Sequence, residues 1–504
     1  MKRTVLILII LSFISRISGF LREVFMAWRF GATIHTDTYI AALTVPVLVI
    51  SFVTVGLSNS LIPVLAAAEK KGQREVFFNR LLTVVGVIAV VFMLVIIVLA
   101  KPLNQIIVRG FSPEEINRVA YYSRMLAVPG LFQLLSFAIM GYLQQNNRFY
   151  IAATASIPMN FGTIIGAIVS PDPTNITVLV IGTIIGYLLQ LLWVVFPLAR
   201  TKFRFRFDFD LKDEHFRMMA LLIVPVIITL SASQINGIIN RAIASSLAEG
   251  SISLLSYVQK VNGLFYQTLV VTLSTVLFTR QAKLSSNQDW KGIFQVTRNN
   301  LSSVMMLIVP IMLGMMFLST QVIQIVFQRG AFTAEDSVKG GLVLLFYSPS
   351  LIAMSSTELL SKMFFSMRHP KKPMIATLVN ISLNIVLNLL VYRTYGIYGL
   401  AAAASIASLS GVFVLIMMAR KIFQQENIHF FTPSYLKYVL AGGLMILILF
   451  GLKALPPISG LSVLPYTLLC GLVGAGTYFA GLYVLKTDEF MTVVAQARQR
   501  LKRS

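Results

Sequence analysis

Apolar runs of about 20 residues recur from one end of the chain to the other, separated by short polar segments. A run of that length, wound as a helix, crosses the hydrocarbon core of a bilayer, which is about 30 Å thick. We therefore predict an all-α polytopic membrane protein with fourteen transmembrane helices. The predicted helices lie at residues 4–28, 38–66, 80–100, 119–143, 149–170, 176–198, 217–247, 251–280, 300–327, 338–366, 373–393, 398–420, 433–453 and 462–485. The first continues without a small-residue cleavage site, so we expect a retained helix and not a signal peptide.

The charges of the loops alternate in register with these helices. Basic residues gather after even-numbered helices, for instance at 69–74, 200–212, 280–298 and 368–372, whereas a loop such as 171–175 carries none. Lys and Arg are enriched in the short cytoplasmic loops of membrane proteins. The alternation predicts an even number of spans with both termini cytoplasmic.

The longest polar break, Thr201 to Arg217, divides the first twelve helices into two sets of six. Its alternation of Phe with charged residues is typical of an amphipathic segment on the cytoplasmic leaflet. Two equal sets with the same orientation indicate parallel structural repeats. The predicted parts are an N-terminal lobe at 1–200, a linker at 201–216, a C-terminal lobe at 217–422, two further helices at 433–485 and a basic cytoplasmic tail at 486–504.

Composition supports a membrane protein and excludes several other classes. The chain is 57% hydrophobic and 12% charged, against about 25% charged for a soluble domain. Its net charge of +23 would suggest nucleic acid in a soluble protein, but here the basic residues lie in loops that face anionic lipid. We expect membrane lipids and no nucleic acid as partners. The single cysteine, Cys470, excludes an intramolecular disulfide, and we predict no metal site.

Charged residues inside the first apolar run provide the strongest functional signal. Arg16 and Arg22 lie there, and an arginine at the centre of a membrane helix costs about 2.5–3.5 kcal/mol on insertion scales. We expect both to face an aqueous cavity and to bind an anion. Being six residues apart, they share a face only if the helix bends near Ser18-Gly19, where close packing or local unwinding is expected. Asp37 has two interpretations that are compatible with each other: a gate that pairs with a cation, and the N-cap of the second helix.

Further polar side chains at membrane depth form a second set of candidates. Lys260 is the cation expected to bind the anion in the second half. For the asparagines we weigh interhelical hydrogen bonds, worth about 0.6–2 kcal/mol each, above a functional role. Additional residues of the cavity or its gate are Glu23, Asn59, Arg241 and Gln259.

Several segments together resemble one known family. They read SRISGFLREVFMAWRFGA from Ser15, then TDTYIAA, QNNRF at 145–149, SQINGIINRAIASSLAEGSIS at 233–253 and RGAFTAEDS at 329–337. On these residues the chain resembles the MurJ (MviN) lipid II flippases of the multidrug/oligosaccharidyl-lipid/polysaccharide exporter superfamily. The resemblance implies two six-helix lobes in a V around a central cationic cavity, with a groove for the lipid tail at the last two helices.

The resemblance also implies roles for individual residues. Arg16, Arg22 and Asp37 match positions that the family needs for function, and Lys260 stands where the family usually has an arginine. Lysine keeps the charge but lacks the bidentate fork that suits phosphate. Gln259 stands where an acidic residue is common, and the second helix lacks the family's cation.

Coupling is the property in which the chain departs most from the family. Some members bind sodium through acidic residues on the seventh and eleventh helices. The nearby positions here, our candidates for ion coupling, are Asn236, Asn240, Asn380 and Asn384. Sodium coupling, proton coupling and the membrane potential alone all stay open, and no cofactor is expected.

The prediction for function is a lipid II flippase in the bacterial plasma membrane, acting as a monomer and without catalytic residues. It would move the undecaprenyl-diphosphate-linked peptidoglycan precursor from the inner to the outer leaflet by alternating access. One alternative is a flippase for another polyprenyl-diphosphate oligosaccharide. Another is a cation-coupled multidrug antiporter with Glu358 as its carboxylate. A membrane transferase is disfavoured because the acidic cluster at 208–214 lies among basic residues in a loop.

Overall fold

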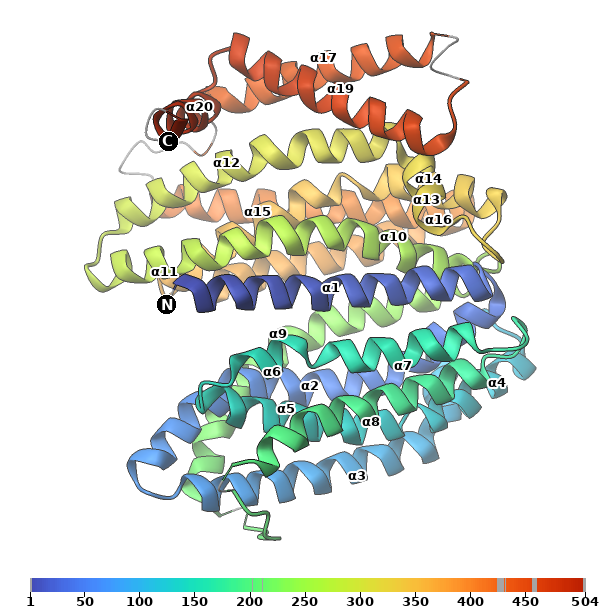
Figure 1. Ribbon diagram of the computed structural model, residues 1–504, viewed down its shortest axis with the longest axis vertical. Helices are drawn as coiled ribbons and strands as arrows, with labels where there is room; N and C mark the ends of the chain where they lie inside the picture. The colour runs from blue at the N-terminus through green and yellow to red at the C-terminus, as the bar shows by residue number, and fades with distance from the viewer. Residues whose placement is uncertain are drawn as a thin grey trace. The chain divides into compact units, whose positions relative to one another are not determined.

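Every regular element in the part of the chain that the structure describes is a helix. The computed structural model describes residues 2–201, 203–210, 212–423, 430, 432–455 and 460–501, and for some helical positions within them, such as 220–233, the backbone alone. The chain forms two units, which Figure 1 colours along the sequence. Unit 1 comprises residues 1–253 and 329–333, and unit 2 comprises residues 254–328 and 334–504.

In the part of unit 1 that the structure describes, nine helices follow one another through short connections. They are α1 (Lys2–Phe30), α2 (Ile34–Lys70), α3 (Arg74–Ile107), α4 (Pro113–Met125), α5 (Val128–Gln145), α6 (Phe149–Thr154), α7 (Ser156–Ile168), α8 (Thr177–Ala199) and α9 (Glu214–Ala244). The sequence analysis counted α9 with the C-terminal lobe, whereas here α9 packs along α2 within unit 1. Gln234 of α9 donates a hydrogen bond to the Ser51 hydroxyl of α2 over 3.0 Å.

Unit 2 holds the remaining helices. They are α10 (Ser251–Phe265), whose first turn belongs to unit 1, the π-helix η1 (Tyr266–Val271), α11 (Thr272–Ser286), α12 (Trp290–Phe317), α13 (Ser319–Phe327), α14 (Ala334–Tyr347), α15 (Ser350–Ser366), α16 (Lys371–Ile422), α17 (Pro433–Lys453), α19 (Val463–Val484) and α20 (Asp488–Leu501).

Ten helices among the described residues are long and apolar enough to cross a membrane, and the bent pair α14–α15 brings the number to eleven. All fourteen predicted segments fall on helical residues, but several are broken. Predicted helix 119–143 is interrupted between α4 and α5, just before Pro129, and α14 and α15 meet at 41° beside Pro349. A proline removes a backbone donor and clashes with the preceding turn. Conversely, predicted helices 373–393 and 398–420 form the single element α16, with non-helical φ and ψ at Gly396.

Successive spans of unit 1 alternate in direction, with α4–α5 and α6–α7 each forming one span, so the connections gather at two ends. At one end, Trp28 at the end of α1 accepts a hydrogen bond from Ala331, and Gly110 after α3 donates to Ser245 after α9. At the other end, Arg74 at the start of α3 donates to Asn146 after α5. This gathering agrees with the alternation of loop charge in the sequence, because odd-numbered and even-numbered loops lie at opposite ends.

Glycines bring α7 and α8 into direct backbone contact. Each helix carries the same five residues, GTIIG, at 162–166 and at 182–186. A Cβ on Gly162 would lie 2.3 Å from Gly186 Cα, and one on Gly182 would lie 2.6 Å from Gly166 Cα. Small residues spaced four apart allow membrane helices to approach closely. The repeated motif therefore holds this antiparallel pair together.

The helix α20, near the end of the chain, packs against α12 and α19 of unit 2. The sequence analysis predicted a basic cytoplasmic tail at 486–504, but α20 occupies most of it. The Glu489 carboxylate of α20 accepts a hydrogen bond from the Ser302 hydroxyl of α12. Burial alone would raise the pKa of Glu489, but hydrogen bonds from Ser302, Ser434 and Tyr438 outweigh it and lower that pKa. The carboxylate thus anchors α20 in its charged form.

The α7–α8 contact leads to a test of stability. We expect Gly162→Val to lower the thermal denaturation midpoint of the detergent-purified protein by several degrees, since the added atoms need space that Gly186 occupies. The matched control is Gly471→Val in α19, where a Cβ would meet nothing within 4 Å. Equal midpoints for the two variants would contradict the role given to the glycines.

Candidate functional site

Arg22 forms a compact polar cluster on the inner side of α1. Its guanidinium makes an ion pair of 2.7 Å with Glu23 and donates a 3.3 Å hydrogen bond to the Asn160 side chain of α7. The Glu23 side chain is 5% exposed and that of Arg22 is 23% exposed. Arg22 therefore has a carboxylate partner on its own helix. A guanidinium has more N–H donors than these two bonds use, so Arg22 can still donate to an anion.

Ser18 and Gly19 serve close packing and not unwinding. The Asn160 amide donates to the Ser18 hydroxyl over 2.9 Å, and a Cβ on Gly19 would lie 3.5 Å from the same amide nitrogen. The helix α1 is unbroken from Lys2 to Phe30. Because α1 does not bend here, Arg16 and Arg22 do not share a face of the helix. The Arg16 side chain is half-buried.

Asp37 caps a helix other than its own. Its two carboxylate oxygens accept hydrogen bonds from the backbone N–H of Gly250, at 3.0 Å, and of Ser253, at 2.7 Å. These groups belong to the start of α10, where the first backbone N–H groups have no partner within the helix. The interpretation of Asp37 as N-cap of the second helix is wrong, because Thr33 holds that position. A carboxylate also favours the positive end of the α10 dipole.

Glycines allow the backbones at this end of unit 1 to come together. Gly250 has φ +81° and Gly330 has φ +57°, in the left-handed region that other residues rarely adopt. A Cβ on Gly250 would lie 2.1 Å from the Ala32 carbonyl oxygen, and one on Gly330 would lie 2.3 Å from the Trp28 carbonyl oxygen. The motif LAEGSIS therefore supplies the backbone shape at the start of α10 that Asp37 caps, and RGAFTAEDS supplies the close approach to the end of α1.

Lys260 lies on α10 in unit 2, together with Gln259, and both are exposed. Arg16, Arg22 and Asp37 belong to unit 1. Among the remaining candidates, Arg241 is half-buried on α9, while the side chain of Asn59 lies outside the described residues.

Unit 2 carries a charged cluster that the sequence analysis named only in part. Glu358 on α15 makes a 3.1 Å ion pair with Lys362, and its oxygens accept hydrogen bonds from Tyr266 and Ser274. Tyr266 opens the π-helix η1, and single π-helical turns are frequent at functional sites. Glu358 was the candidate carboxylate for a cationic drug, but a lysine already neutralises it. The spacing of four residues between Glu358 and Lys362 on an apolar helix is the signal that predicts this pair.

The ion-coupling candidates divide between the two units. Asn236 and Asn240 lie on α9 in unit 1, whereas Asn380 and Asn384 lie on α16 in unit 2. Asn384 is buried and accepts a hydrogen bond of 3.2 Å from Asn388. Among the described residues, no three His, Cys, Asp or Glu side chains are placed to hold a metal ion.

The apolar spans and the cations within them define a class: a polytopic α-helical membrane transporter. The profile of the family "Lipid II flippase MurJ" matches residues 26–464. The chain belongs to this family, whose members are integral proteins of the bacterial inner membrane.

Individual relatives extend over most of the chain. It is 27% identical over 418 residues to the "Probable lipid II flippase MurJ" of Thermotoga maritima, covering 82% of this chain and 85% of that protein. It is 26% identical over 499 residues to the Bdellovibrio bacteriovorus protein of the same description, covering 95% and 94%.

Solved structures agree on the fold. One titled "Lipid II flippase MurJ, inward closed conformation" superposes with a TM-score of 0.81 at 24% identity, over 96% of this chain and 99% of that one. An inward-facing multidrug resistance MATE transporter of the MOP superfamily gives a TM-score of 0.67 at 12% identity, over 82% and 98%.

Removal of the Asp37 carboxylate tests its capping role. We expect Asp37→Ala to speed hydrogen exchange in a peptide covering residues 248–256, because the N–H groups of Gly250 and Ser253 lose their acceptor. Loss of a side-chain cap costs about 0.5–2 kcal/mol, which corresponds to a few-fold to roughly thirty-fold faster exchange. Asp37→Asn retains one acceptor oxygen and should show a smaller change. Unchanged exchange in both variants would show that the cap is not formed in solution.

Proposed function

We propose that this chain is a lipid II flippase of the bacterial inner membrane that works by alternating access. It moves the polyprenyl-diphosphate-linked precursor from the cytoplasmic to the outer leaflet, as a monomer with fourteen spans and both termini cytoplasmic. The observation that carries the proposal is the family match over residues 26–464. Cations within the apolar helices give it a chemical basis.

The cations would bind the diphosphate of the substrate. Arg16 and Arg22 in α1 and Lys260 in α10 supply positive charge on membrane helices. Charge-assisted hydrogen bonds to phosphate are about twice as strong as neutral ones. Glu23 and Asn160 orient the Arg22 guanidinium, so that its remaining N–H groups are held in place before the substrate arrives.

The contacts around Asp37 would form the outer gate. The carboxylate joins the start of α2 to the start of α10, and Ala331 is joined to Trp28 at the same end of unit 1. By the predicted topology this end faces outward. Opening of the cavity to the outside would break these few hydrogen bonds, whose small number makes the gate reversible.

The membrane potential would supply the driving force. A charge that crosses the full membrane field gains about 2.3 kcal/mol per 100 mV, so two diphosphate charges gain roughly 4–5 kcal/mol. The candidate ion-coupling positions are asparagines, which bring no negative charge to a sodium ion. No cofactor is needed for this cycle.

Complementation in a strain depleted of its own lipid II flippase tests the function. We expect the wild-type gene to restore growth and Arg16→Ala to fail, because a phosphate-binding cation is lost. Arg16→Lys should restore growth in part, since it keeps the charge. The control is Arg118→Ala, which removes an exposed arginine of α4. With equal protein levels in the membrane, growth supported by Arg16→Ala as well as by wild type would contradict the assigned role.

Flipping measured in vesicles tests the driving force. With purified protein and fluorescent lipid II, we expect an inside-negative potential to increase transport out of the negative lumen, and its collapse by an ionophore to reduce it. Transport that is indifferent to the potential but requires a sodium gradient would show that the coupling assignment is wrong.

A further inference from the structure

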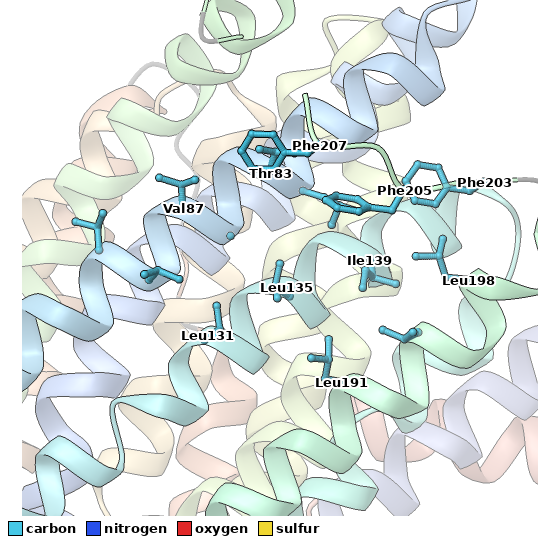
Figure 2. A pocket seen from close by; sticks show the side chains of 15 residues that line it. Thr83, Val87, Leu131, Leu135, Ile139, Leu191, Leu198, Phe203, Phe205 and Phe207 are labelled. Carbon is cyan, nitrogen blue, oxygen red and sulfur yellow. The ribbon is translucent and has the colours of Figure 1, made fainter. Parts of the chain in front are cut away.

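A cavity of about 600 Å³ lies within unit 1, and none of the residues that line it belongs to the Arg22 cluster (Figure 2). Its walls come from α3, α5 and α8, through residues such as Val87, Leu135 and Leu191. Its roof is the extended segment Phe203–Asp210, which we call the strap. Thr83 is the only lining residue with a polar side chain, and its hydroxyl already donates to the Asn79 carbonyl. The cavity therefore suits a purely apolar group.

The strap presents one apolar face and one cationic face. Phe203, Phe205 and Phe207 line the cavity, while Arg204 and Arg206 are exposed. Alternate residues of an extended chain point to opposite sides. Figure 2 shows the three rings along the roof, with Phe203 beside Leu198 and Phe207 beside Thr83.

Backbone hydrogen bonds fix the strap to α3. Arg206 N–H donates to the Asn79 side-chain oxygen over 2.8 Å, and the Asn79 amide donates to the Arg204 carbonyl over 3.3 Å. Asp208 N–H donates to the Thr83 hydroxyl over 3.3 Å. These bonds use the backbone of Arg204 and Arg206. The Arg204 guanidinium donates one hydrogen bond, of 3.3 Å, to the Phe203 carbonyl oxygen, and a guanidinium has further N–H donors that can bind an anion.

Arg80 of α3 secures the far end of the strap. Its guanidinium lies 2.9 Å from Asp208, 3.3 Å from Asp210 and 2.8 Å from Asp213. Burial would raise the pKa of Asp213, but hydrogen bonds from Arg80 and His215 outweigh it and hold that pKa below its usual range. These three aspartates are thus engaged with Arg80, at the end of the strap opposite to Arg204.

The near end of the strap is cationic and faces apolar surface. Arg200 stacks over the Phe196 ring, with 4.2 Å between its guanidinium carbon and the ring centroid, and Arg204 and Arg206 follow it in sequence and are exposed. Phe196 is 61% exposed and Leu192 is 51% exposed on α8. Apolar side chains exposed on spanning helices contact lipid chains, and basic residues at the membrane surface attract anionic headgroups.

We propose that this cavity holds an acyl chain of an anionic phospholipid, whose phosphate binds Arg204 and Arg206. A soluble ligand would need convergent polar groups, which the lining lacks. An acyl chain gains little by leaving other acyl chains, so selectivity among lipids comes from the headgroup charge. Such a lipid would tie α3, α5, α8 and the strap together at one end of unit 1.

Photolabelling of the full-length protein in vesicles tests the site. The probe is phosphatidylglycerol with a diazirine in its acyl chain, and phosphatidylcholine with the same chain is the neutral comparison. We expect phosphatidylglycerol to label peptides covering 82–91, 131–139 and 191–198 several-fold more than phosphatidylcholine does. The double variant Arg204→Gln/Arg206→Gln should reduce its labelling to the level of the neutral lipid, whereas Arg118→Gln should not.

A second variant fills the cavity itself. Leu135→Trp should reduce labelling of these peptides by both lipids, while Leu472→Trp on the exposed face of α19 should leave it unchanged. Should Leu135→Trp fail to fold, the double variant Arg204→Gln/Arg206→Gln still tests the lipid site, because its substitutions lie on exposed side chains and leave the packing intact.

Equal labelling by both lipids in the wild type would overturn the proposal. The proposal would also be overturned if a long polyprenyl phosphate displaced the label and excess phosphatidylglycerol did not. That result would identify a prenyl chain as the occupant of the cavity. The labelling does not depend on flipping, so it can fail while the proposed transport function holds.

Discussion

Water is absent from the hydrocarbon core of a bilayer, so a polar group placed there is stabilised by partners within the chain. Arg22 meets this requirement with Glu23 and with Asn160 of another helix. Asp37 meets it with the spare N–H groups of α10. Asn160 lies on α7, so its bond with Arg22 joins α1 to α7. The bonds of Asp37 join α2 to the start of α10 in the same way. The residues of the candidate site thus also hold helices of unit 1 together.

The helices were predictable from the sequence because a membrane sets their length. The breaks were not, since Pro46 and Pro63 lie inside the unbroken α2 while α5 begins beside Pro129. Arg22 and Glu23 are neighbours in sequence, and adjacent residues on a helix do not face one another, so nothing in the pattern suggested their ion pair. The partners of Asp37 lie more than two hundred residues away, and only the fold brings them together.

The linker between the sixth and seventh predicted helices illustrates a second limit of sequence patterns. Its alternation of Phe and charge correctly indicated two faces, one apolar and one polar. The pattern could not reveal that the apolar face would cover a cavity of the protein itself, nor that a single arginine on α3 would bind three aspartates of the linker. Such contacts depend on tertiary packing, which local periodicity does not encode.

Unit 1 is not continuous in sequence, because its last piece, Arg329–Thr333, follows the segment Leu254–Gln328 of unit 2. The bond between Ala331 and Trp28 therefore cannot form until the ribosome has passed this segment. At about 5–20 residues per second, synthesis of the segment takes roughly 4–15 s. During that interval α1 is already made, yet one end of its unit is unfinished. Membrane insertion of the first helices and completion of their fold are thus separate events in the biogenesis of this protein.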